Sequence, residues 1–187
     1  MSMAREHGWT LSDFLAWEAG QERRHAFIDG EVVMMTGGTQ AHALIAANLL
    51  AFLRPALRGS LCRPFGSDMR LPIPDTGNSR YPDVMIDCGR FQQPEINASE
   101  PTVIFEVLSS STAWYDQTRK LRDDESLPSL RQYVCVSQSE RRVSVWTRDA
   151  TGRLVPEPDL TGEDDALLLA IADIRLPLAA IYEDIGF

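Results

Sequence analysis

The chain has 187 residues, of which 44% are hydrophobic and 24% charged, and its formal net charge at pH 7 is −9. This length and composition are those of an ordinary globular protein with a buried core, which excludes the disordered and fibrous classes. Acidic side chains outnumber basic ones by 27 to 18, which argues against a protein that coats nucleic acid or binds anionic membranes. A local basic groove remains compatible with that charge.

The N-terminal third predicts a helix, a hairpin and a second helix. Thr10 and Asp13 have capping-box spacing, so we expect a short amphipathic helix over residues 10–19. Residues 25–28 and 31–34 flank Asp29-Gly30, a dipeptide that favours a two-residue type I′ hairpin turn. A longer helix is expected over residues 40–57.

The remaining chain predicts a series of strands around one further helix. Strands are expected near residues 61–65, 68–71, 84–86, 103–107, 132–137 and 143–147, with a turn-rich loop at 72–80, a polar connection at 88–101 and a helix at 113–125. Beyond Gly152 we expect one or two strands and a short helix within residues 166–181. No linker or repeat divides the chain, so we expect one domain over residues 1–187 with its core at about 10–180.

The cysteines and the apolar runs indicate a cytoplasmic protein. Cys62, Cys88 and Cys135 form an odd set without CxxC spacing, which predicts buried free thiols in a reducing compartment. No apolar run approaches the roughly 18 residues of a membrane span, and the first nine residues lack the apolar core of a signal peptide. We therefore expect no membrane association.

Two carboxylates stand at the ends of apolar segments that read as buried strands. Asp83 precedes Val84-Met85-Ile86, and Glu106 interrupts a run from Val103 to Leu108. A buried carboxylate is costly unless a cation, a metal or hydrogen-bond donors compensate it. If the strands are neighbours, the two acids can hold one hard cation such as Mg²⁺ or Mn²⁺. A structural ion pair of Glu106 with Arg70 or Arg131 explains the pattern equally well.

Lys120 stands out because it is the only lysine among 18 basic residues. Arginine cannot readily lose its proton, whereas an ammonium beside a metal can act as a compact charge or exchange protons with a water. The alternative is an exposed pair with Asp116, four residues earlier on the predicted helix, worth about 0.3–0.5 kcal/mol.

Other candidate residues carry weaker signals. The histidines His7, His25 and His42 are too scattered for a zinc set, although His42, near the start of the long helix, could reach a site if it does not serve as a surface or capping residue. The chain contains neither a GxSxG motif nor a glycine-rich phosphate loop. Arginines near the candidate site indicate a local basic groove or, equally, a solvated surface of mixed sign: Arg80, Arg119, Arg122 and Arg131.

The order and spacing of several short motifs resemble the Uma family (DUF820-like), restriction-endonuclease-like proteins of the PD-(D/E)XK nuclease superfamily. The resemblance covers roughly residues 10–180 and rests on Ile28-Asp29-Gly30-Glu31, His42, Tyr81-Pro82-Asp83-Val84, Glu106-Val107-Leu108-Ser109, Thr112, Asp116, Lys120 and Tyr133. It implies an α+β or α/β fold, a restriction-endonuclease-like mixed β-sheet flanked by helices, with an N-terminal helix and hairpin. It also implies a metal held by Asp83, Glu106 and the backbone carbonyl of Val107. The superfamily's usual lysine position is Leu108 here, and Lys120 resembles a migrated replacement.

The expected function is therefore a Mg²⁺- or Mn²⁺-dependent endonuclease that hydrolyses DNA, with Asp83 and Glu106 holding the metal and Lys120 assisting the attacking water. Supporting roles are expected from a small set of polar residues: Glu31, His42, Asp116 and Gln117. Cleavage of a duplex favours a homodimer, since two-fold symmetry lets each protomer address one strand. The alternative is an inactive binding or regulatory module that keeps the nuclease fold.

Overall fold

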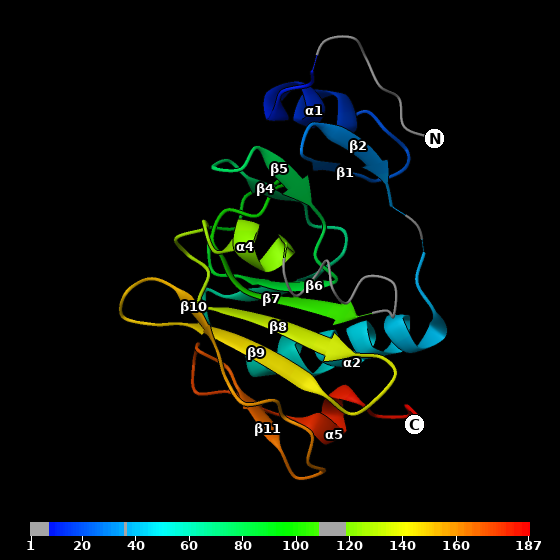
Figure 1. The fold of residues 1–187 in the computed structure, drawn as a ribbon, viewed down its shortest axis with the longest axis vertical. Helices are drawn as coiled ribbons and strands as arrows, with labels where there is room; N and C mark the ends of the chain where they lie inside the picture. Colours follow the sequence, from blue (N-terminus) through cyan, green and yellow to red (C-terminus); the bar gives the residue numbers. More distant parts are fainter. Residues whose placement is uncertain (1–7, 36, 109–118) are drawn as a thin grey trace.

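The computed structural model describes residues 8–35, 37–108 and 119–187, and its strands form two main sheets arranged along the long axis of the molecule (Figure 1). One sheet has the order β2-β1-β5-β4, formed by Glu31–Met34, His25–Ile28, Asn78–Arg80 and Leu71–Ile73. The other has the order β10-β9-β8-β7-β6-β3, formed by Leu154–Pro156, Val143–Arg148, Gln132–Ser137, Pro101–Leu108, Val84–Asp87 and Arg63–Gly66. The arrangement confirms the expected mixed sheet flanked by helices.

The N-terminal end of the molecule confirms the two local predictions made for it. Helix α1 spans Leu11–Glu18, and the Thr10 hydroxyl and the Asp13 carboxylate cap each other's backbone N–H groups. Strands β1 and β2 pair around Asp29 and Gly30, whose φ angles of 51° and 85° are those of a type I′ turn.

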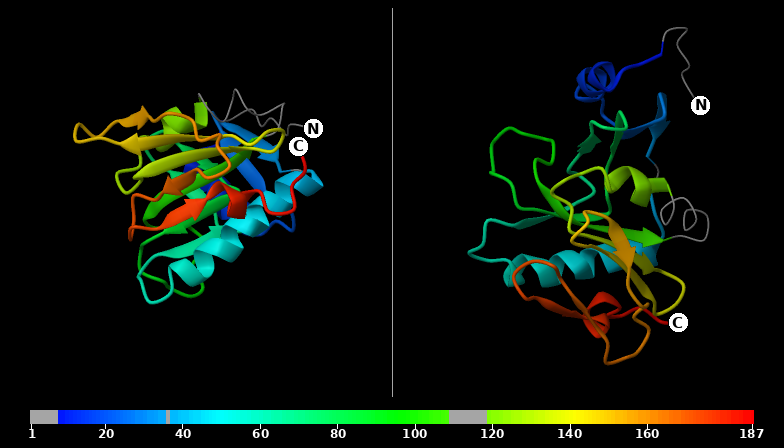
Figure 2. Two further views of the ribbon diagram at one scale, coloured as in Figure 1. Left: turned by 90° about the horizontal axis from the view of Figure 1, so that it is seen from below. Right: turned by 60° about the vertical axis from the view of Figure 1, so that its left-hand side comes forward.

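The six-stranded sheet is mixed because one of its pairs, β7 with β8, is parallel, while the others are antiparallel. Helix α2, which spans Gln40–Ala56, lies across one face of this sheet (Figure 2). Its buried Ile45, Leu49 and Leu53 pack against the sheet, together with the C-terminal helix α5 (Leu178–Ile181) and the small sheet of β11 (Ala166–Leu168) and β12 (Arg175–Pro177). We call this the α2-side core.

The opposite face of the six-stranded sheet packs against β4 and the chain around helix α4, which spans Leu121–Asp124. This second core contains the following buried side chains: Leu71, Ile73, Met85, Ile104, Leu108, Leu127, Leu130, Tyr133, Cys135 and Leu154. Glu106 lies between Ile104 and Leu108 on β7 and therefore points to the same face. Among the described residues, no helix combines the length and apolar character needed to cross a membrane.

Three expected segments differ from the structure. The turn-rich loop expected at residues 72–80 is wrong in part, because β4 and β5 form a hairpin there and pair Leu71 with Arg80. The strand expected at 68–71 begins only at Leu71. The C-terminal region contains three strands rather than one or two, namely β10, β11 and β12. The described part of the helix expected at 113–125 is α4 with the two residues before it.

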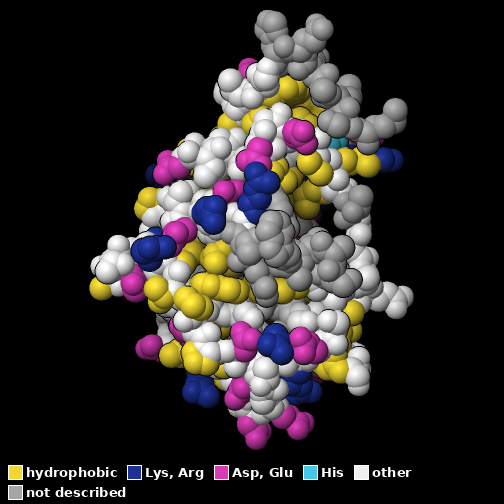
Figure 3. Space-filling view, viewed as in Figure 1, with side chains coloured by type: hydrophobic (Ala, Val, Ile, Leu, Met, Phe, Trp, Pro, Cys, Tyr) yellow, Lys and Arg dark blue, Asp and Glu magenta, His cyan; other side chains and the backbone are white. Residues whose placement is uncertain are grey.

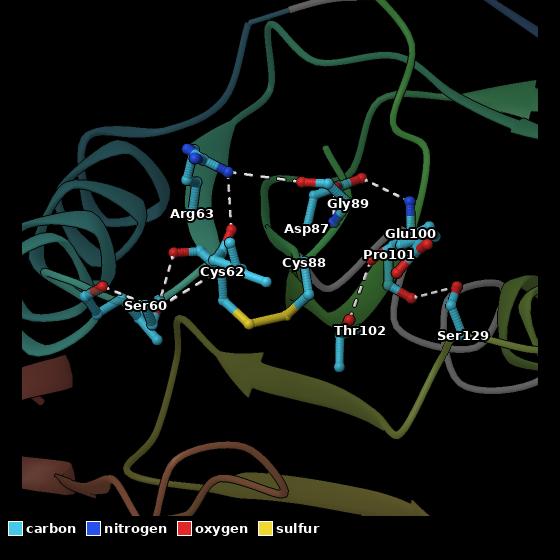
Figure 4. The surroundings of a disulfide bond; sticks show 12 residues. Ser60, Cys62, Arg63, Asp87, Cys88, Gly89, Glu100, Pro101, Thr102 and Ser129 are labelled. Atoms are coloured by element: carbon cyan, nitrogen blue, oxygen red, sulfur yellow. Dashed lines mark hydrogen bonds between the residues drawn. A yellow bond between two sulfur atoms is a disulfide. The ribbon is translucent and has the colours of Figure 1, made fainter. Parts of the chain in front are cut away.

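The expectation of three free thiols is wrong, because Cys62 and Cys88 form a disulfide (Figure 4). The antiparallel register pairs Arg63 with Asp87, so the next position outward places Cys62 opposite Cys88 although they are 26 residues apart in sequence. Cys135 is buried and is not part of a disulfide, as expected. Asp87 organises the adjacent loop, since its carboxylate accepts hydrogen bonds from the backbone N–H groups of Gly89, Ser99 and Glu100 at 2.7–3.0 Å.

We predict that replacing Cys62 and Cys88 together by alanine lowers the free energy of unfolding by about 3 kcal/mol, because the cross-link closes a loop of moderate length in the unfolded chain. Urea denaturation measures this change. Adding a reductant should destabilise the wild type but not the double variant. In the unreduced wild type, alkylation under denaturing conditions should label Cys135 alone, and labelling of all three cysteines would contradict the cross-link.

A second prediction concerns Tyr182, whose buried hydroxyl donates to the carbonyl of Arg142 at 2.7 Å. Burial raises the pKa of Tyr182 to about 12, so the folded state favours the neutral phenol. The stability that the neutral Tyr182 phenol contributes is fully present below about pH 10, the pKa of tyrosine in the unfolded chain. It is lost as the pH rises towards the pKa of Tyr182 in the folded protein. Between about pH 9 and pH 11, the wild type should lose about 1 kcal/mol more unfolding free energy than Tyr182→Phe, as urea titrations at both pH values would measure. Parallel curves for the two proteins would contradict the raised pKa.

Candidate functional site

The two predicted acids lie opposite each other on neighbouring strands. Val84 of β6 pairs with Phe105 of β7, so Asp83 and Glu106 occupy the next antiparallel position. Val84 and Phe105 point into the α2-side core, and the period-two alternation of strands directs the two carboxylates to the other face. The Glu106 side chain is only 4% exposed and Asp83 is 18% exposed. The fold thus brings together the pair that the sequence separates by 23 positions.

Lys120 supplies the cation that the buried Glu106 requires. Its Nζ lies 2.8 Å from Glu106 Oε2, and its side chain is 18% exposed. Of the two arginines considered as alternative partners, Arg70 is bound elsewhere, with its guanidinium 2.8 Å from Glu18. Leu108, at the position where the superfamily usually places its lysine, is buried in the second core. Lys120 therefore reaches Glu106 from the connection between β7 and β8.

Asp83 is held by two groups from different elements. The backbone N–H of Val107 donates to Asp83 Oδ2 at 2.7 Å, and His42 Nε2 lies 3.1 Å from the same oxygen. His42 stands in the first turn of α2, where Thr39 provides the cap by accepting from the His42 backbone N–H. The fold therefore brings His42 to the site, and the capping role considered for its side chain belongs to Thr39.

The other supporting residues are placed differently. Glu31 is exposed on the edge strand β2 of the other sheet. Asp116 and Gln117, expected near Lys120, lie outside the described residues. Within residues 8–35, 37–108 and 119–187, no three His, Cys, Asp or Glu side chains converge in an arrangement that could hold a metal ion. Among the predicted acidic residues, those that the structure brings together are therefore Asp83 and Glu106.

Arg80 is the residue whose place the sequence analysis predicted least well. It is 3% exposed and forms ion pairs with Asp123 and Asp124 of α4, so it does not contribute to a surface groove. Arg119 is exposed and paired with Asp29 of the hairpin turn. The signal that could have indicated this network is the Asp123-Asp124 dipeptide three residues after the only lysine, since two adjacent acids in a packed helix require a cation.

The comparison with known protein families identifies the chain. The family model Uma2, described as "Putative restriction endonuclease", matches residues 11–179. The chain belongs to the Uma2 family. Two uncharacterized proteins of Synechocystis sp. are each 30% identical to it, one over 75% of this chain and 74% of its own, the other over 74% and 80%.

A solved structure shares the fold of this Uma2 protein. The crystal structure of a protein from Anabaena variabilis, described as "a putative nuclease belonging to DUF820", superposes with a TM-score of 0.75. The match covers 92% of this chain and 97% of the other, at 16% sequence identity. The expected restriction-endonuclease-like fold is therefore confirmed.

The visible surface of this Uma2 protein is mixed in sign. On the face shown in Figure 3, Lys or Arg side chains alternate with Asp or Glu side chains, and neither sign forms one continuous stripe. Exposed groups of the protein also form ion pairs, for example Arg142 with Glu140 and Asp159. Such pairs contribute little to stability because water screens them.

We predict that Lys120→Met lowers the free energy of unfolding by about 3 kcal/mol, because it leaves the Glu106 carboxylate buried without its cation. Glu106→Gln should lower the free energy of unfolding by less, because the Lys120 ammonium that it leaves unpaired with Glu106 keeps some contact with water. The double variant should be more stable than the sum of the two losses predicts, as urea denaturation in a double-mutant cycle would measure.

The matched control is Arg142→Met, which removes two exposed ion pairs, with Glu140 and with Asp159, and should lower the free energy of unfolding by at most about 1 kcal/mol. Strict additivity of the Glu106 and Lys120 substitutions would show that the two groups do not interact.

Proposed function

We propose that this Uma2 protein is a Mg²⁺- or Mn²⁺-dependent endonuclease that hydrolyses phosphodiester bonds of DNA. The observation that carries the proposal is the opposed carboxylate pair, Asp83 and Glu106, with the Lys120 ammonium 2.8 Å from Glu106. Family membership supports a nuclease. Residues 1–187 would act as one domain.

The donor set fits a hard divalent cation. Two carboxylates at facing positions can share one ion, and water and substrate phosphate usually complete the shell of Mg²⁺. The N–H and C=O of one residue in an extended strand point to the same edge, and the Val107 N–H points to Asp83, so its carbonyl is directed towards the same side. Asp83, Glu106 and the Val107 carbonyl would therefore hold the metal.

The cation and the protein's own residues would have separate roles in hydrolysis. The bound cation would polarise the scissile phosphate and lower the pKa of a bound water. Lys120, placed beside Glu106 and 18% exposed, can orient the attacking water and donate to a phosphoryl oxygen whose negative charge increases during the reaction. His42 and the Val107 N–H fix the Asp83 carboxylate before substrate arrives.

The proposed substrate is duplex DNA, and the proposed assembly is a homodimer in which each protomer cleaves one strand. The net charge of −9 and the mixed surface imply that phosphate contacts are confined to the neighbourhood of the site. Basic residues that would serve there include Arg119, two residues before α4, and Arg122, the second residue of α4.

One observation favours a second function, a non-hydrolytic binding or regulatory module. Asp83 and Glu106 are each paired with a basic side chain of the same chain, His42 and Lys120 respectively. A structural ion-pair network would show the same contacts without any metal.

The proposal predicts saturable binding of Mn²⁺ by the wild type in isothermal titration calorimetry and loss of that binding in Glu106→Gln, which keeps the side chain's shape but removes its charge. The matched control is Glu31→Gln, which removes the same charge from an exposed position on β2 and should bind like the wild type. In plasmid cleavage, Lys120→Met should lower the rate on the order of 10²- to 10³-fold. Asp83→Asn should abolish metal-dependent cleavage.

Equal Mn²⁺ binding by the wild type and Glu106→Gln would contradict the metal site. Absence of binding by the wild type, both alone and with a DNA oligonucleotide present, would favour the binding module.

A further inference from the structure

The placement of Lys120 is not explained by the helix that follows it. Helix α4 has only four residues, Leu121–Asp124, and Lys120 at its start makes no side-chain capping hydrogen bond. Isolated helices this short are unstable in water, because nucleation costs more than the few hydrogen bonds return. Contacts from other elements therefore help to fix the backbone from which Lys120 reaches Glu106.

Arg80 of β5 provides those contacts. The Nη1 atom of its guanidinium lies 3.1 Å from Asp124 Oδ1 and 3.5 Å from the carbonyl oxygen of Lys120, while Nη2 pairs with the carboxylate of Asp123. Arg80 is 3% exposed and Asp124 is 2% exposed, so the low-dielectric surroundings strengthen the pairing and also make it costly to break. Arg80 thus binds both the residue that carries the ammonium and the helix immediately after it.

A second set of hydrogen bonds connects α4 to the four-stranded sheet. The side-chain amide of Asn78, two residues before Arg80, donates to Asp123 at 2.7 Å and accepts from the backbone N–H of Asp29 at 2.9 Å. Asp29 in turn pairs with Arg119, the residue before Lys120. The residues on both sides of Lys120, Arg119 and Asp123, are therefore held by contacts from the four-stranded sheet.

We propose that Arg80 is a positioning residue that holds Lys120 over Glu106. The planar, forked guanidinium can contact two carboxylates and a carbonyl at once, which a lysine ammonium on a flexible stem cannot match. The catalytic meaning of this placement rests on the proposed nuclease function. The placement itself does not.

The single lysine makes a direct test possible. When the protein is produced with lysine labelled with ¹³C and ¹⁵N, Lys120 is the only labelled side chain, and NMR reports its Cε and Nζ without metal or DNA. Glu106→Gln defines the signal of Lys120 without its carboxylate partner. In Arg80→Gln, the Lys120 signal should move most of the way from the wild-type position towards that reference.

Arg70→Gln is the matched control. Arg70 is equally buried at 3% exposed, stands just before β4 in the neighbouring part of the fold, and pairs with Glu18 rather than with α4. Its substitution should destabilise the protein to a similar extent and leave the Lys120 signal in place. Asp123→Asn, at a partly exposed carboxylate, should shift the signal in the same direction but less, and decides the question if Arg80→Gln does not fold.

An unchanged Lys120 signal in folded Arg80→Gln would overturn the proposal. If Arg80→Gln does not fold, an unchanged signal in Asp123→Asn would do the same. An equal shift of the signal in Arg70→Gln would also overturn it.

If the wild type cleaves plasmid DNA, Arg80→Gln should lower kcat on the order of 10- to 100-fold with KM unchanged, because misplacement of a catalytic group by a small distance has that effect. If the wild type does not cleave, the NMR comparison still decides the role of Arg80, so failure of the nuclease function and failure of this inference are separable.

Discussion

The carboxylate of Glu106 imposes the strictest requirement on this fold. All eight residues of β7 are buried, with one side packed on the α2-side core and the other on the second core. A charge in the middle of such a strand must meet an opposite charge or a bound cation. The chain meets that requirement with Lys120, which it brings back over β7 in the connection to β8. Because Lys120 directly precedes α4, this contact also joins that helix to β7.

Buried charged side chains hold helix α1 against the four-stranded sheet. At one place Arg70 pairs with Glu18 of α1, and the hydroxyl of Tyr81 donates to the same carboxylate at 2.6 Å. Burial and this carboxylate raise the pKa of Tyr81 well above its ordinary value. Buried pairs of this kind add little net stability compared with apolar packing, but they restrict which groups can face each other. These contacts fix the position of α1 relative to the residues that precede β4 and follow β5.

Much of the fold could be predicted from signals within a few residues of each other. The features that were predicted wrongly depend on contacts between residues far apart in the sequence. The Thr10–Asp13 capping box and the Asp29-Gly30 turn act within a few residues, and both are confirmed. The strand at residues 78–80 was missed because Asn78 and Ser79 favour turns, while Phe27 of β1 supplies the pairing partner. The pairing of Cys62 with Cys88 depends on the register of β3 and β6, which spacing alone does not reveal.

The candidate site shows the same division. Asp83, Glu106 and Lys120 were recognisable because each breaks a pattern, namely an apolar strand or an arginine-only composition. The structure places the Lys120 ammonium at Glu106 and His42 at Asp83. The Asp123-Asp124 dipeptide indicates that α4 requires a cation, but the sequence does not show that Arg80, more than 40 positions away, supplies it.

The parallel pairing of β7 with β8 links formation of the sheet to formation of the site. Two parallel neighbours need a crossover connection, and here the crossover contains Lys120. Contacts between strands separated in this way form slowly, because the intervening chain must first be ordered. During synthesis, a nascent chain that ends near Leu108 would present Glu106 with no cation to meet it. Pairing of β8 with β7 and the approach of Lys120 to Glu106 therefore depend on ordering of the same connection.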